Sequence, residues 1–131
     1  MNRFVLILAA FISTSALAQG ADIVAGIPDI PLMPGFTEAV DETVIYDKPE
    51  GRIVFASASN SAARYSSVLD YYRTELLERG WLERRALWGD MAFQRTGELL
   101  EINIEPMDGI IPASPLSDTV GVRVSFQLSP L

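Results

Sequence analysis

Apolar and polar residues alternate most clearly near the C-terminal end of the chain. Between residues 119 and 128 every second side chain is apolar: Val120, Val122, Val124, Phe126 and Leu128. The residues that alternate with them are Gly121, Arg123, Ser125 and Gln127. Because successive side chains of a strand point to opposite faces, the pattern predicts a strand with one buried face and one face that meets water or a partner.

Residues 99–105 repeat this period of two. Their apolar set is Leu100, Ile102 and Ile104, and their polar set is Glu101, Asn103 and Glu105. Four more segments are predicted to be strands: residues 42–47, 52–57, 81–87 and 91–96. The sequence Lys48-Pro49-Glu50-Gly51 supplies a turn that joins the first two of these as a hairpin, since proline presets φ and glycine tolerates a positive one. The Ser-, Ala- and Asn-rich residues 57–61 are expected to leave the sheet toward a helix.

Between residues 67 and 80 the spacing of apolar residues changes to three and four, as on one face of a helix. The stripe consists of Val68, Leu69, Tyr72 and Leu76, with Leu77 beside it. Ser67 and Asp70 have the spacing of a capping box at the start, and Gly80 stands where a C-terminal cap is expected. We therefore predict one helix that begins at Ser67 and is closed by Gly80.

The predicted order is two strands, one helix and then three or four strands, with mostly short connections. Short connections favour antiparallel neighbours, so the expected fold is α+β, a two-layer sandwich with a single helix packed on an antiparallel sheet of about five to six strands. The helix stripe is expected to meet a sheet core formed by Val122, Val124, Phe126, Ile102, Ile104, Phe93 and Phe55. These elements are assigned to one domain over residues 42–131.

The N-terminus has the layout of a secretory signal peptide. Arg3 precedes an apolar run at residues 4–12, and the small-residue box Ala16-Leu17-Ala18 follows. The alternative is an uncleaved membrane anchor, but the run is broken well short of the roughly 20 residues that cross a bilayer. We expect residues 1–18 to be removed and the mature chain to begin at Gln19 in the periplasm, with full secretion as the alternative.

The composition of the chain excludes several kinds of catalytic and metal site. The chain has no cysteine and no histidine, which removes disulfides, Ser-His and Cys-His nucleophiles and the usual zinc and haem ligands. Its net charge of −7 becomes −8 when Arg3 leaves with the leader, and an acidic surface repels nucleic acids and anionic membranes. We therefore expect a protein that is not an enzyme, holds no cofactor, binds no nucleic acid and keeps no stable membrane anchor after cleavage.

Two stretches of turn and packing residues resemble the core of small exported bacterial proteins of uncharacterised function. They are Tyr46-Asp47-Lys48-Pro49-Glu50-Gly51-Arg52-Ile53 and Val68-Leu69-x-Tyr71-Tyr72-x3-Leu76-x3-Gly80-Trp81. The resemblance covers most of the mature chain. It implies a fold and a compartment, and it transfers no activity because its motif consists of turn and packing residues.

Two proline-rich apolar segments are candidates for contact with a partner. In residues 19–41, prolines at a spacing of three favour an extended arm without backbone pairing of its own. Residues 106–118 form a loop that is long for a small domain. Each segment either packs on its own domain or offers a docking surface. Together with Trp88 at a turn, the candidate partner contacts are Ile30, Leu32, Met33, Phe36, Trp88, Ile110, Ile111 and Leu116.

The polar faces of the last two predicted strands form the second candidate surface. Glu101, Asn103 and Glu105 place oxygen ligands about 7 Å apart along one strand. With Asp108 beyond them, these residues could hold a calcium ion or form hydrogen bonds to a sugar, and Arg123 completes the candidate ligand face. The alternative is a solvated sheet face whose carboxylates pair with Arg123 or Arg95 across strands.

One functional expectation and one alternative follow from these features. The lack of catalytic residue types and the two proline-rich apolar segments favour a non-catalytic, exported interaction or accessory protein of the bacterial cell envelope that contacts a protein partner. The alternative is a periplasmic protein that binds a small ligand or a metal ion, either between helix and sheet or on the face that carries Glu101.

Overall fold

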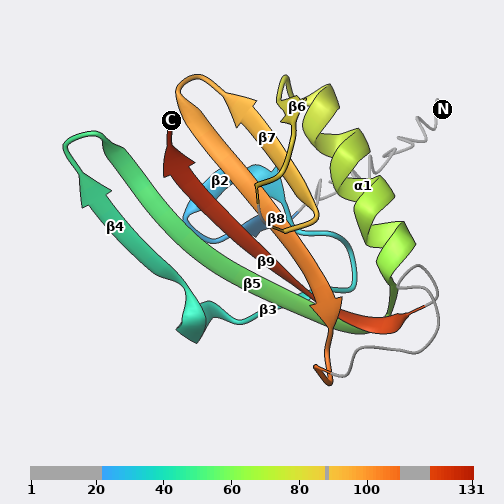
Figure 1. The fold of residues 1–131 in the computed structure, drawn as a ribbon. Helices are drawn as coiled ribbons and strands as arrows, with labels where there is room; N and C mark the ends of the chain where they lie inside the picture. The colour runs from blue at the N-terminus through green and yellow to red at the C-terminus, as the bar shows by residue number, and fades with distance from the viewer. Residues whose placement is uncertain (1–21, 88, 110–118) are drawn as a thin grey trace, which may run out of the picture.

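The computed structural model describes residues 22–87, 89–109 and 119–131 of the 131-residue chain. Over these residues one α-helix packs on an antiparallel sheet of seven strands, and a small two-stranded hairpin lies apart from that sheet (Figure 1). The predicted α+β sandwich with a single helix is confirmed.

The elements follow one another along the chain in the order β1 (Ile23–Val24), β2 (Ile27–Pro31), β3 (Thr37–Glu38), the 3-10 helix η1 (Val40–Glu42), β4 (Val44–Lys48), β5 (Gly51–Arg64), α1 (Tyr65–Glu78), β6 (Leu82–Arg84), β7 (Met91–Arg95), β8 (Glu98–Pro106) and β9 (Val120–Pro130). The main sheet has the order β3-β5-β9-β8-β7-β6, and β4 also pairs with β5. The strand beyond the six that the sequence predicts is β3, which comes from the proline-rich arm.

The centre of the sheet is the long antiparallel pair of β5 and β9. β5 runs through residues 57–61 to Arg64, so the expectation that these small polar residues leave the sheet is wrong. Their register with β9 is continuous from Val54 opposite Leu128 to Asn60 opposite Val122. Pairing along both edges of β5 outweighs the weak strand preference of Ala, Ser and Asn, because strand propensity depends strongly on context.

The helix begins at Tyr65, two residues before the predicted start at Ser67. β5 passes directly into α1, and the Tyr65 N–H donates to the Thr119 carbonyl at 3.1 Å, so the start is set by the sheet rather than by the capping box. The predicted end is confirmed. Gly80 has φ of 87°, its N–H donates to the Leu77 carbonyl, and the Trp81 N–H donates to the Leu76 carbonyl, as in a Schellman cap.

The core lies between α1 and the sheet. Val68, Tyr72 and Leu76 are fully buried on the helix, and Tyr72 makes an edge-on ring contact with Phe126 of β9. Phe55 is not part of this core as predicted, because it is 40% exposed on the other face of the sheet. Val54 occupies the core-facing position opposite Leu128, and the side chain next to it must point the opposite way.

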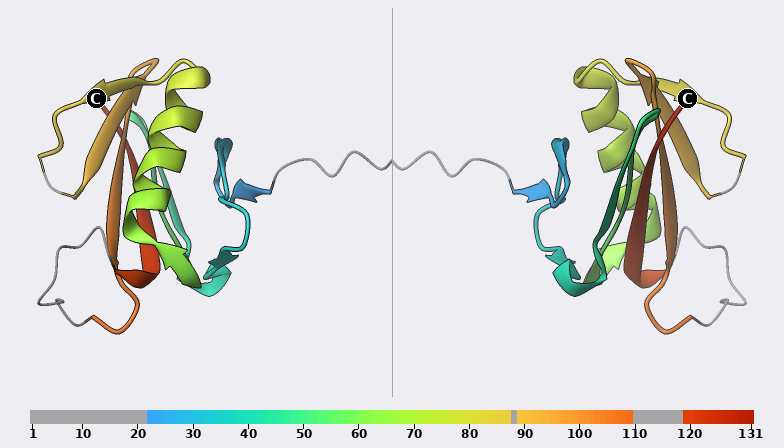
Figure 2. Two further views of the ribbon diagram at one scale, coloured as in Figure 1. Left: turned by 90° about the vertical axis from the view of Figure 1, so that its right-hand side faces the viewer. Right: turned by 90° about the vertical axis from the view of Figure 1, so that its left-hand side faces the viewer.

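The arm is more structured than its prolines suggest. β1 and β2 pair with each other as a hairpin, which corrects the expectation of an arm without backbone pairing of its own. The hairpin lies on the same side of the sheet as α1 (Figure 2). The Met33 N–H donates to the Tyr72 hydroxyl at 3.2 Å, the Arg52 guanidinium donates to the Gly26 carbonyl at 3.1 Å, and Arg95 pairs with Asp29.

Two neighbouring leucines of α1 allow a matched test of this packing. Leu76 is fully buried and Leu77 is 46% exposed. We expect Leu76→Ala to lower the free energy of unfolding by about 2–5 kcal/mol, because it removes buried methyl groups and leaves a cavity. Leu77→Ala should change it by about 0.5 kcal/mol or less. Urea denaturation of both variants checks this, and equal losses would contradict the orientation of the helix.

Candidate functional site

The face of the main sheet opposite α1 carries no second layer of helix or strand among the described residues (Figure 2). We call it the open face. It presents alternate residues of the two central strands and of β8, namely Phe55, Ser57, Arg123, Ser125, Gln127, Glu101, Asn103 and Glu105. The period of two that the sequence shows in β8 and β9 is therefore the source of this surface.

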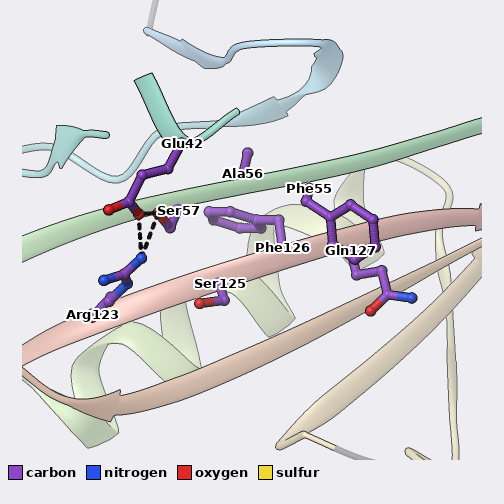
Figure 3. Close-up of a pocket in the computed structure, with 8 residues that line it drawn as sticks. All are labelled: Glu42, Phe55, Ala56, Ser57, Arg123, Ser125, Phe126 and Gln127. Carbon is purple, nitrogen blue, oxygen red and sulfur yellow. Dashed lines mark hydrogen bonds and ion pairs between the residues drawn. The ribbon is translucent and has the colours of Figure 1, made fainter. Parts of the chain in front are cut away.

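A shallow depression of about 320 Å³ lies where β5 and β9 meet η1 (Figure 3). It is lined by Glu42, Phe55, Ala56, Ser57, Arg123, Ser125, Phe126 and Gln127. Most of the polar side chains among them come from alternate positions of two paired strands, which fixes their spacing. The depression therefore rests on the most extensively paired part of the fold.

The polar end of the depression is a cluster of three side chains. The Ser57 hydroxyl donates to Glu42 Oε2 at 3.0 Å, and Arg123 Nη2 donates to Ser57 Oγ at 3.2 Å. Arg123 also forms an ion pair with the Glu42 carboxylate. Both charged side chains are about half exposed, so the pair contributes at most about 1 kcal/mol to stability. Its main effect is to hold a charged donor and a charged acceptor at one place on the open face.

The other end of the depression is formed by Phe55 and Gln127, which lie opposite each other on β5 and β9 (Figure 3). The phenyl ring is half-exposed and offers apolar area beside an amide that can donate and accept hydrogen bonds. Ser125 lies between this end and the charged cluster. The depression thus combines an apolar contact, neutral polar groups and a paired charge.

The structure brings together only some residues of the candidate ligand face that the sequence predicted. Asn103, Glu105 and Arg123 lie on the open face, and Glu105 is opposite Arg123 in register. Glu101 lies in the same row but is buried. Arg123 forms an ion pair with Glu42, and Arg95 forms one with Asp29. Within the described ranges no cluster of three or more acidic side chains is placed to hold a metal ion.

The structure separates the candidate partner contacts into three groups. Ile30 and Phe36 are buried in the domain's own core, and they offer no surface to a partner in this structure. Leu32 and Met33 are partly buried against the same core. The arm therefore folds back on its own domain, which was one of the two alternatives. The remaining candidates, which are Trp88, Ile110, Ile111 and Leu116, lie outside the described residues.

Sequence reasoning missed Glu42 and Asp90 as organising residues. Asp90 ends the connection from β6 to β7, and its Oδ2 accepts the Ile104 N–H at 2.6 Å, while its other carboxylate oxygen accepts the Tyr65 hydroxyl. The side chain thus ties the connector to β8 and to the start of α1. Glu42 is 81 residues from its partner Arg123, a separation at which no local pattern reports the contact.

Comparison with known proteins finds no family model, no curated protein and no solved structure that matches this chain. Among the described residues, none of the helices has the length and apolarity needed to cross a bilayer. Function must therefore be inferred from the surfaces and side chains described above.

The partly buried Tyr65 hydroxyl, which donates to Asp90, makes the free energy of unfolding depend on pH in the alkaline range. Burial, the hydrogen bond to Asp90 and the negative charge of Asp90 raise the pKa of Tyr65 from 10.0 to about 12. Burial also raises the pKa of Tyr72 above its ordinary value. A raised folded-state pKa gives stability that is complete below the unfolded pKa and is lost as pH rises through the folded one.

We expect the free energy of unfolding to fall between about pH 10 and pH 12. The Tyr65→Phe variant should show a shallower fall, because phenylalanine does not ionise, although it starts from a lower stability without the Asp90 bond. Urea denaturation at a series of pH values from neutral to alkaline measures both curves. Parallel curves above pH 10 would show that Tyr65 does not contribute to the pH dependence.

Proposed function

We propose that this protein is a non-catalytic interaction or accessory protein of the bacterial cell envelope and that its open face contacts a protein partner. The observation that carries the proposal is the depression between η1, β5 and β9, where Phe55 and Arg123 flank a row of neutral polar side chains. Arginine and aromatic side chains, phenylalanine among them, are enriched in protein–protein interfaces.

The shape of the depression favours a macromolecular partner over a small molecule. Sites for small molecules are usually enclosed and bury about 70–90% of the ligand surface. This depression is open to solvent on one face of the sheet, where a partner can cover Phe55, Ser125 and Gln127 together. A protein surface of matching shape excludes water from such a site, while a small molecule leaves much of its own surface wet.

The chemistry of the site supports a binding role. The chain has no histidine and no cysteine, so the most common general bases and nucleophiles of enzymes are absent from the sequence. The two charged groups of the depression, Glu42 and Arg123, are paired with each other. Such a pair can orient a partner through complementary charge, which contributes to specificity more than to affinity.

The proposed compartment is the periplasm, with secretion beyond the cell as the alternative. It is supported by the leader-like residues 1–18, with their basic start, apolar run and Ala16-Leu17-Ala18 box. The absence of cysteine makes folding independent of the redox state of the compartment. A net charge of −7 disfavours nucleic acid as the partner and favours a neutral or basic protein.

The alternative function is binding of a small polar ligand at the same depression. Its volume of about 320 Å³ lies at the lower end of the range of small-molecule sites. Ser125 and Gln127 provide hydroxyl and amide groups suited to sugar hydroxyls. Metal binding is not carried forward, because the described acidic side chains are not clustered for it.

A site-specific photo-crosslinker distinguishes the two functions. Placed at Gln127 in the native envelope, it should capture a discrete protein species different from this chain. The control position is Leu77, which is exposed on α1 away from the open face and should capture nothing specific. Capture should be lost when Arg123→Glu is introduced, because the reversed charge opposes Glu42 and any acidic group that Arg123 binds on the partner.

Silence at Gln127 together with a thermal stabilisation by sugars would favour the small-ligand alternative. Equal capture at Gln127 and Leu77 would contradict the assignment of the open face as the contact surface.

A further inference from the structure

The strand β4 forms an unprotected edge of the main sheet. It pairs with β5 along one side, and no strand among the described residues pairs with its other side (Figure 1). All five of its residues are exposed. An edge strand of this kind offers a row of backbone N–H and C=O groups to another strand.

The register of the β4–β5 hairpin shows which backbone groups are offered. Lys48 and Gly51 are opposite each other next to the two-residue turn, so they form the hydrogen-bonded pair that closes it. Backbone groups then point alternately toward β5 and away from it. Ile45 and Asp47 direct their backbone N–H and C=O groups outward. A further strand would form its hydrogen bonds with these groups.

The side chains of β4 are largely apolar, whereas edge strands usually carry residues that prevent pairing with another strand. Val44, Ile45 and Tyr46 are 39%, 52% and 56% exposed. Natural edge strands are commonly blunted by charge, proline or a bulge, and three consecutive exposed apolar residues leave this edge suited to pairing. The apolar run is followed directly by Asp47 and Lys48, the only lysine in the chain.

We propose that β4 pairs antiparallel with β4 of a second copy of this chain, about a two-fold axis at Ile45. In this register Ile45 lies opposite the partner's Ile45, and Val44 lies opposite the partner's Tyr46. The axis falls on a residue whose backbone groups point outward, as a hydrogen-bonded pair requires. A symmetric pairing of identical strands is the simplest closed assembly, because one surface patch complements itself.

Matching of the facing side chains selects this register. Val44, Ile45 and Tyr46 then face only apolar side chains of the second copy. Thr43 lies opposite the partner's Asp47, and this pair lacks one of its two backbone bonds because the Thr43 N–H already donates to the Val40 carbonyl. Moving the axis to Tyr46 would place Ile45 opposite the partner's Asp47, and moving it to Asp47 would place two like charges opposite each other.

The same register completes apolar rows that run across the strands. Phe55 is opposite Val44 in the β4–β5 pair, and Ile53 is opposite Tyr46. Joining the two edges therefore extends the row from Phe55 and Val44 to the partner's Tyr46 and Ile53. On the other face of the sheet, Val54 and Ile45 meet the partner's Ile45 and Val54. Every member of these rows is apolar, and cross-strand pairs of this kind stabilise sheets.

Single cysteines test the register, because the natural chain has none. In a hydrogen-bonded antiparallel pair the Cα atoms are about 5.5 Å apart, within the range that a disulfide spans. We expect the Ile45→Cys variant to form a covalent dimer under mild oxidation. Asp47→Cys should not, because the two copies of that residue are separated by about 14 Å along the strands. Leu82→Cys, on the opposite edge of the sheet, is the second control.

Sedimentation of the purified chain over about 1–100 µM tests assembly without any crosslink. We expect a concentration-dependent dimer whose dissociation constant rises about tenfold or more with Ile45→Lys, since two lysines would then face each other at the axis. Leu82→Lys adds the same charge to a 68% exposed leucine on β6 and should leave the dimer unchanged.

A chain that stays monomeric over this range would overturn the proposal and leave the edge to a strand of another protein. Crosslinking that is equal at positions 45, 47 and 82, or strongest at 82, would overturn it as well. The test does not depend on the open face, so its failure is separate from failure of the proposed function.

Discussion

The fold depends on one geometric constraint, which is that a single helix cannot cover the apolar face of this sheet. α1 has 14 residues and is therefore about 21 Å long and about 10 Å across with its side chains. The main sheet is six strands wide along its hydrogen-bonded path, and its five inter-strand spacings of about 4.8 Å make it about 24 Å wide. More than half of the apolar face would be wet without a second cover. The hairpin of β1 and β2 supplies that cover, with Val24, Ile27 and Ile30 buried.

The strand β5 carries small side chains in this core. Ala56 and Ala58 are buried in the same cluster as the apolar residues of the arm, Val24, Ile27 and Ile30. The prolines of the arm favour its docking, because a backbone whose φ angles are already fixed loses less conformational entropy when it packs on the sheet. The arm is therefore a structural part of the core and not a tail added to it.

The sequence pattern predicted correctly the elements that depend only on neighbouring residues. The period of two in β8 and β9, the stripe of α1 and the glycine after it follow from side-chain direction and φ preference alone. The length of β5 and the start of α1 depend instead on pairing with β9 and on the Thr119 carbonyl, which are distant in sequence. The strand that contains Phe55 was predicted without its register. A shift of one residue exchanges the buried and exposed faces of a strand, so the pattern alone does not say which face carries Phe55.

The candidate site shows the same division between local and distant information. The alternation of residues 119–128 is sufficient by itself to mark Arg123 and its neighbours as a possible binding face. Glu42 could not be included, because η1 reaches Arg123 only through the fold, across 81 positions of sequence. The arm residues were ambiguous for a related reason. An apolar proline-rich segment has the same sequence pattern whether it covers its own core or another protein, and only the width of the sheet decides between them.

The open face and the β4 edge are neighbouring parts of one surface, because Phe55 belongs both to the depression and to the apolar row that ends at Val44. Pairing of two chains through β4 would join their open faces side by side in a continuous sheet and place two depressions on it, related by the two-fold axis. A partner that presents two equivalent segments could then bind both, and the second contact would form at a high effective concentration. Even if one depression bound such a partner weakly, the assembled pair would therefore hold it firmly.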